Sequence, residues 1–101
     1  MRRATTPTHI FTFPESVEVG SVTEVLVSYS QCGKEVLRKT IDDLMIDTES
    51  NSFSVKLTQD ESTKFAPGEA LVQLKARKNN AVFASQMICF QVKPVLNSED
   101  I

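Results

Sequence analysis

The one histidine and the two cysteines are the side chains of this sequence best suited to acid–base or nucleophilic chemistry. His9 falls in the run Thr8–Phe13 (THIFTF), where it shares a side with Phe11 and Phe13. Hydrolysis by a serine or cysteine nucleophile needs a base held beside that nucleophile. A histidine between aromatic side chains is more often a packed or edge residue than such a base. We therefore interpret the protein as a non-enzyme.

Two cysteines are too few for a disulfide framework. Cys32 precedes Gly33 in an expected turn, whereas Cys89 lies in the last long strand, on its core-like side. A buried cysteine usually behaves as a small hydrophobic residue, so packing is the simplest role for Cys89. A disulfide between Cys32 and Cys89 is the alternative. The sequence leaves the redox compartment open and slightly favours a reducing cytoplasm.

Acidic residues gather in the segment from Asp42 to Glu49, which raises the question of a calcium site. Calcium loops commonly need a glycine at a sharp turn between alternating oxygen ligands. This segment has no glycine, and Leu44–Ile46 interrupts it, so a solvated loop is the better interpretation. The three glycines of the chain lie too far apart for a phosphate loop, and no Cys or His spacing suits a metal. We expect no cofactor, no metal and no small-molecule substrate.

Length and charge narrow the classes of partner. At 101 residues the chain has room for one domain. Its formal net charge of -2 does not suggest the clustered basic surface of a nucleic-acid-binding protein. Lys75, Arg77 and Lys78 cluster near an expected turn, but no outward aromatic accompanies them, and such charges keep an edge strand soluble. No apolar leader follows Met1, and no run is long enough to span a membrane. We expect a protein made in soluble form that binds neither nucleic acid nor membrane.

Short alternating segments separated by turns indicate an all-β fold. About seven strands are expected, with turn signals every 8 to 12 residues, which predicts an antiparallel Ig-like β-sandwich; a small barrel is the alternative. Thr58 and Glu61 match a capping box, which predicts one short helical turn before Pro67. We expect an N-terminal arm over residues 1–7, the sandwich domain over 8–92 and a C-terminal tail over 93–101. The expected strands include Thr8–Phe13, Val22–Gln31, Lys34–Thr40, a segment around Leu44–Ile46, Ser54–Leu57 and two long strands within Glu69–Val92.

The two long strands are expected to fold back on each other about Asn79-Asn80, since asparagine tolerates the positive φ of a two-residue loop. That register gives one core-like side, with the pairs Ala76–Phe83, Leu74–Ser85, Val72–Met87 and Ala70–Cys89. On the other side it pairs Lys75 with Ala84, Gln73 with Gln86 and Leu71 with Ile88.

The second side of this hairpin becomes apolar away from the turn. Apolar side chains on a second sheet face favour a second partner, which is either the chain's own tail or a neighbouring subunit. We therefore predict a protein interface made by Leu71, Ile88 and Phe90, assisted by Leu96 and Ile101 of the tail.

Several segments resemble a group of small proteins encoded in prophages of Gram-positive, often gut-dwelling bacteria. They are Arg2–Pro14 (RRATTPTHIFTFP), Val27–Gln31 (VSYSQ), Val55–Phe65 (VKLTQDESTKF), Val72–Arg77 (VQLKAR), Ala84-Ser85 and Val92–Asn97 (VKPVLN). The resemblance implies a phage structural component of the tail or baseplate region. It implies other phage structural proteins, or further copies of this chain, as partners. The protein would be made in the host cytoplasm and would reside in the virion if structural.

Two other functions compete with this interpretation. A carbohydrate-binding or adhesion module usually presents exposed aromatic side chains for stacking, and this chain has no Trp and a single tyrosine, Tyr29. A prophage-encoded intracellular regulator would instead bind a host protein. Neighbouring genes would separate the regulator from the structural component.

Overall fold

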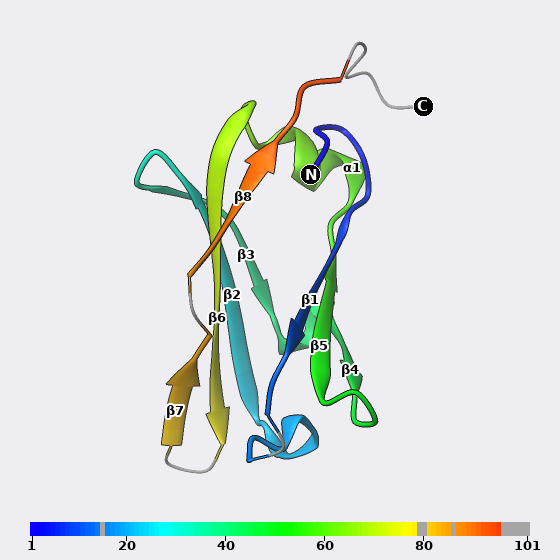
Figure 1. The fold of residues 1–101 in the computed structure, drawn as a ribbon, viewed down its shortest axis with the longest axis vertical. Helices are drawn as coiled ribbons and strands as arrows, with labels where there is room; N and C mark the ends of the chain where they lie inside the picture. Colours follow the sequence, from blue (N-terminus) through cyan, green and yellow to red (C-terminus); the bar gives the residue numbers. More distant parts are fainter. Residues whose placement is uncertain (15, 79–80, 86, 96–101) are drawn as a thin grey trace.

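The computed structural model describes residues 1–14, 16–78, 81–85 and 87–95, which form two antiparallel β-sheets packed face to face (Figure 1). The smaller sheet has the strand order β1-β5-β4, and the larger has the order β3-β2-β6-β7, with β8 pairing with β6 beyond β7. The predicted all-β sandwich is confirmed, with eight strands instead of about seven. The strands are β1 (Thr8–Thr12), β2 (Glu24–Gln31), β3 (Lys34–Thr40), β4 (Leu44–Asp47), β5 (Ser52–Lys56), β6 (Gly68–Lys78), β7 (Ala81–Ala84) and β8 (Ile88–Val92).

Among the described residues, the strand order is that of an immunoglobulin-like sandwich without a strand in the first position. In such a fold the strands A, B, E and D form one sheet, and C, F and G form the other, with C′ added in some variants. Here β1, β5 and β4 occupy the positions of B, E and D, while β3, β2, β6 and β7–β8 occupy those of C′, C, F and G. Among the described residues no strand lies in the A position beside β1. The outer edge of β1 is therefore an edge of the fold.

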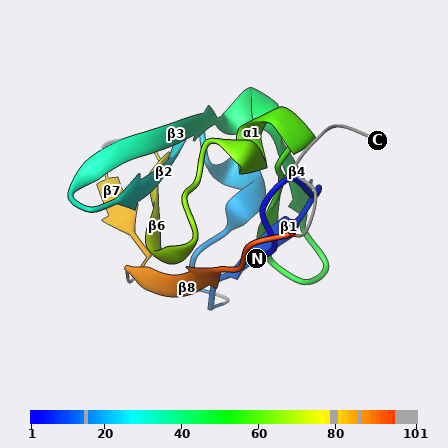
Figure 2. The ribbon, with the colours of Figure 1, turned by 90° about the horizontal axis from the view of Figure 1, so that it is seen from above.

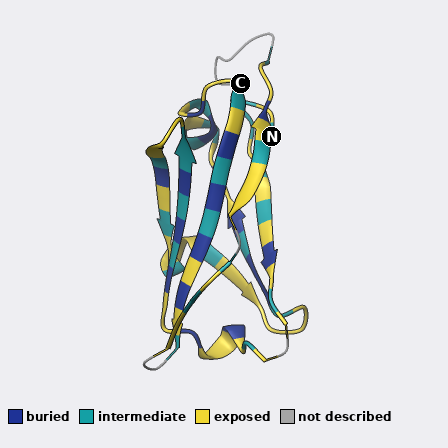
Figure 3. Ribbon diagram, turned by 60° about the vertical axis from the view of Figure 1, so that its left-hand side comes forward, coloured by how far each residue is buried: buried dark blue, intermediate teal, exposed yellow. Residues whose placement is uncertain are grey.

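Buried and more exposed residues alternate along strands of both sheets (Figure 3). The buried apolar side chains form one core. As predicted, Val25, Val27 and Tyr29 of β2 share one buried face. On β1, Phe11 is buried and His9 half-buried, whereas the residues between and beside them are exposed. Sheet residues that point inward along a strand recur at every second position, so this alternation fixes which face meets the core. The buried apolar set also includes Phe53, Val55, Leu57, Phe65, Ala70, Val72, Leu74, Ala76 and Val92.

A short helix, α1 (Gln59–Thr63), lies at one end of the sandwich (Figure 1). The predicted capping box is present, since the Glu61 amide donates to the Thr58 hydroxyl and the Thr58 amide donates to the Glu61 carboxylate. Glu61 also forms an ion pair with Lys39 of β3. The helix is thereby tied to the edge of the large sheet.

The first residues, predicted as a polar arm, lie against the domain beside β8, as Figures 1 and 2 both show. The N-terminal ammonium donates to the carbonyl of Gln91 at 2.7 Å, and the Lys93 amide donates to the carbonyl of Met1 at 2.7 Å. The Arg3 guanidinium donates to the carbonyls of Thr63 and Phe65, which end the helical turn. Backbone pairing and helix capping therefore hold a segment whose polar composition suggested a free arm.

The β6–β7 pairing follows the predicted register, with Ala76 opposite Phe83 and Lys75 opposite Ala84. The β6–β8 pairing is shifted by one residue, so the predicted pairing of Leu71 with Ile88 is wrong. Leu71 instead lies opposite Cys89. In the same way Val72 lies opposite Ile88 in place of Met87, and Ala70 lies opposite Phe90 in place of Cys89.

Ser85 provides the physical reason for this shift. Its amide donates to the Leu74 carbonyl at 2.8 Å, and its hydroxyl accepts from the Leu74 amide at 2.9 Å. A side-chain oxygen thus takes the place of a main-chain carbonyl in the ladder, and one extra residue is accommodated, as in a β-bulge. The predicted partner of Gln73, at position 86, lies outside the described residues.

Candidate protein-contact surfaces

The register shift separates the three hairpin residues predicted as one patch. Leu71 remains on the outer face of the large sheet and is half-buried. Phe90 turns inward, with its ring 6.1 Å from that of Tyr29 and 6.0 Å from that of Phe65, so its predicted outward placement is wrong. Ile88 shares the inward side of β8 but lies where the sandwich is open, and 44% of it is exposed. The predicted tail residues Leu96 and Ile101 lie outside the described residues.

Met87 lies near Leu71 on the outer face of the large sheet. Met87 is 65% exposed, and with Leu71, Ser28 and Ser30 it lines a shallow depression of about 150 Å³ on the outer face. Met87 is absent from the predicted interface because the predicted register places this residue on the core side. The available signal was Ser85, a polar residue assigned to the core opposite Leu74.

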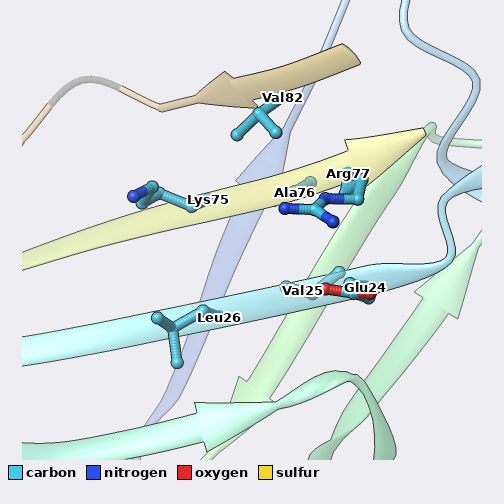
Figure 4. Close-up of a pocket in the computed structure, with 7 residues that line it drawn as sticks. All are labelled: Glu24, Val25, Leu26, Lys75, Ala76, Arg77 and Val82. Atoms are coloured by element: carbon cyan, nitrogen blue, oxygen red, sulfur yellow. The ribbon is translucent and has the colours of Figure 1, made fainter. Parts of the chain in front are cut away.

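A second depression lies on the same face nearer the hairpin turn (Figure 4). It has a volume of about 200 Å³ and combines the apolar side chains of Leu26 and Val82 with the charged side chains of Lys75, Arg77 and Glu24. The strand pairing places Arg77 between Glu24 on β2 and Val82 on β7. This mixture of exposed apolar and charged groups suits contact with another protein surface.

A groove runs between the outer edge of β1 and the β7–β8 edge of the large sheet. Its volume is about 440 Å³, and its lining includes Ile10, Phe13, Ala84 and Ile88. Ile10 is 63% exposed. This groove is not predictable from local sequence patterns, because it depends on which two strands form edges on the same side of the sandwich.

The side chain of His9 packs among aromatic residues of the core. The Nδ1 atom of His9 lies 2.6 Å from the hydroxyl oxygen of Tyr29, and its ring packs on that of Phe90 at 5.2 Å. Burial, and secondarily the positive N-terminus, lowers the pKa of His9. Burial, and secondarily the charge of Glu61, raises the pKa of Tyr29 above its usual range. His9 is therefore a neutral structural partner of a buried tyrosine.

Both cysteines are free and exposed, so the predicted core position of Cys89 is wrong. A hydrogen bond to Glu69, followed by some desolvation and the charge of Glu69, raises the pKa of the Cys89 thiol. A raised pKa keeps the thiol protonated and is the opposite of what activates a cysteine nucleophile. Within the residues that the structure describes, no cluster of His, Cys, Asp or Glu could hold a metal ion. The described helices include none with the length and apolar character needed to cross a membrane.

The chain matches no protein-family model, and no curated protein matches it at a significant level. The surfaces described above are therefore the basis for assigning a function.

Proposed function

We propose that this protein is a non-enzymatic structural or assembly component that works through protein–protein contacts made by the outer face of its large sheet. The supporting observation is the set of apolar side chains on that face. The opposite face of the same sheet already packs against the core, so folding does not require apolar groups here. Their presence favours a second partner. They are Leu26, Leu71, Val82 and Met87.

The charges on this face favour a protein partner with its own mixed surface. Glu24, Lys75 and Arg77 lie around the depression that holds Leu26 and Val82. Interfaces of non-obligate complexes combine an apolar centre with a polar rim, and charged groups at the rim fix orientation and speed encounter. We place Leu71 and Met87 at one contact centre and Leu26 and Val82 at another.

The resemblance to small prophage-encoded proteins supports a phage particle as the setting. In that setting the partner is another phage structural protein or a further copy of this chain. The protein is then made in the host cytoplasm and incorporated into the virion. A sandwich fold alone is compatible with many roles, so this part of the proposal depends on the resemblance.

The burial of the aromatic residues disfavours the carbohydrate-binding alternative. All seven aromatic side chains lie in the described part of the chain, and each is buried or half-buried. Sugar-binding sandwiches need an exposed ring as a stacking platform. A regulator that binds a host protein would use the same outer face, and its gene would lie beside early or lysogeny genes rather than tail genes.

Quantitative mass spectrometry of purified particles, released after induction of the host lysogen, tests the phage setting. We expect the protein at a fixed ratio to the tail proteins in these particles. Presence in the cell lysate combined with absence from the particles would contradict a structural role and favour the regulator.

A further inference from the structure

The edge strand β1 directs unbonded backbone groups away from its own sheet. The Leu57 amide donates to the Pro7 carbonyl at 2.9 Å, and the Phe13 amide donates to the Asn51 carbonyl at 3.0 Å. In an antiparallel ladder the N–H and C=O of a bonded residue point to the same neighbour, and bonded residues alternate along the strand. The odd-numbered residues of β1 therefore bond to β5. The even-numbered ones, Thr8, Ile10 and Thr12, point their backbone groups to the outside.

Within β1 itself, this edge has neither charged side chains nor proline. Edge strands are usually protected by charged side chains, proline or bulges. The edge strand β3 contains Lys34, Glu35, Arg38 and Lys39, and the edge strand β4 ends in Asp47. β1 has no formally charged residue, and Pro7 and Pro14 lie just outside it. Its central residue, Ile10, is among the most exposed apolar side chains of the described protein.

The sequence of β1 complements itself when the strand is reversed. If Ile10 lies opposite Ile10 of a second copy, Thr8 lies opposite Thr12 at both ends. Thr–Thr and β-branched pairs are among the favourable cross-strand pairs of antiparallel sheets, and no like charges come to face each other. Because Thr8, Ile10 and Thr12 all point their N–H and C=O groups outward, each opposed pair can exchange backbone hydrogen bonds.

We propose that two copies of this chain associate through their β1 strands, in an antiparallel pairing centred on Ile10, to form a continuous six-stranded sheet. A second copy thereby occupies the position that strand A takes in a complete immunoglobulin-like sheet. Such an interface is isologous and closes as a dimer, so it leads to no open-ended fibre. The paired edge belongs to the small sheet and is distinct from the outer face of the large sheet that is proposed above as a contact face.

The groove beside β1 contributes to the same contact. Figure 2 places β1 and β8 on one side of the sandwich and β3 on the opposite side. The two-fold axis that pairs the β1 strands brings the groove of each copy next to that of its partner. Ile10 and Ile88, which are 63% and 44% exposed, then lose contact with water together with Phe13. The groove adds apolar contact area to the backbone bonds and cross-strand pairs of the strand edge.

Sedimentation equilibrium over a range of concentrations tests the pairing. We expect a shift from the chain mass of 11.2 kDa toward twice that value in the micromolar to millimolar range, since small interfaces are usually transient. The shift should depend little on salt, because the paired edges are uncharged. An apparent mass that stays at that of one chain up to about 1 mM would overturn the proposal. A dissociation constant of about 1 mM corresponds to a dimerisation free energy of roughly 4 kcal/mol.

Two substitutions on the same sheet face distinguish pairing through the β1 edge from non-specific association. Ile10 and Met45 both lie opposite Ser54, one on each side of β5, and Met45 is 76% exposed. We expect Ile10→Lys to weaken dimerisation at least tenfold and Met45→Lys to leave it unchanged, with both variants keeping the wild-type circular dichroism. Equal effects of the two variants, or no effect of Ile10→Lys, would overturn the proposal.

Engineered cysteines test the register, in a background of Cys32→Ser and Cys89→Ser. Residues bonded across an antiparallel pair have Cα atoms about 5.5 Å apart, within the disulfide range of about 4.4 to 6.8 Å. Ile10→Cys should therefore give a covalent dimer on mild oxidation. Thr12→Cys should not form a covalent dimer. In this register Thr12 lies opposite Thr8, so the two engineered cysteines are four residues apart along the strands, or about 13 Å. Cross-linking of Thr12→Cys in preference to Ile10→Cys would overturn the proposed register.

Discussion

The Nδ1 atom of His9 lies 2.6 Å from the hydroxyl oxygen of Tyr29, and this hydrogen bond joins the two sheets, since His9 belongs to β1 and Tyr29 to β2. Tyr29 is fully buried and its ring also contacts Phe65 and Phe90. The one histidine of the chain is thus the hydrogen-bond partner of the buried hydroxyl of its one tyrosine. This pair is a structural feature of the core, and its energetic contribution can be measured.

Removal of the tyrosine hydroxyl should destabilise the fold. Tyr29→Phe leaves the half-buried His9 ring nitrogen without its partner, which typically costs about 1–3 kcal/mol of unfolding free energy. The double variant His9→Phe/Tyr29→Phe should lose less than the sum of the two single variants, because neither polar group then remains unpaired. Urea unfolding of the four proteins measures this cycle. Strict additivity would show that the hydrogen bond contributes nothing.

The lowered pKa of His9 predicts a loss of stability in mild acid. The unfolded chain has the ordinary histidine pKa of 6.5, and burial lowers the pKa in the folded state. Between the two values the unfolded state binds more protons, so the free energy of unfolding falls as the pH decreases below about 6.5. His9→Phe should remove this slope while keeping the carboxylate titrations at lower pH. Equal slopes for wild type and variant between about pH 6.5 and pH 5 would contradict the assignment.

Ser85→Ala tests the cause of the register shift. The change removes the hydroxyl that accepts from the amide of Leu74, a fully buried residue, and should cost about 1–3 kcal/mol. Hydrogen exchange of the Leu74 amide, followed by NMR, should become faster relative to its neighbours. Ser30→Ala, on the outer face of β2, is the matched control and should change little. Unchanged protection of Leu74 in Ser85→Ala would argue against the hydrogen bond.

Truncations at Phe90 and Leu71 test the corrected orientation of β8. Phe90 packs against Tyr29 and Phe65, so Phe90→Ala should cost about 2 kcal/mol or more. Leu71→Ala, on the outer face, should cost clearly less than that. Thermal unfolding measures both changes. A larger loss for Leu71→Ala would restore the orientation expected from the sequence.

Local signals in the sequence predicted much of this fold. Three correctly predicted features depend only on neighbouring residues or on one strand pair. They are the capping box at Thr58 and Glu61, the alternation of Val25, Val27 and Tyr29, and the β6–β7 register near the hairpin turn. Such features follow from the side-chain period of two and from hydrogen bonds three residues apart.

The features that sequence reasoning missed depend on single long-range bonds. The shift in β8 follows from the hydroxyl of Ser85, and no periodicity shows that this hydroxyl replaces a backbone acceptor. The packing of the N-terminal segment follows from backbone bonds to Gln91 and Lys93, to which its polar composition gives no clue. The groove beside β1 requires the strand order of both sheets. For these reasons the exposure of Met87 and Ile10, on which the proposed contacts depend, emerges only from the structure.

The most direct test of the contact function is the binding of the purified chain to the purified structural proteins encoded beside it, measured by calorimetry. Met87→Asp and Met45→Asp make the same change at two exposed methionines, one between β7 and β8 and one in β4 of the small sheet. We predict that Met87→Asp weakens binding at least about tenfold, as expected for a contact-centre residue, and that Met45→Asp binds like the wild type. Equal binding by wild type and Met87→Asp, or equal weakening by both variants, would contradict an interface on the outer face of the large sheet.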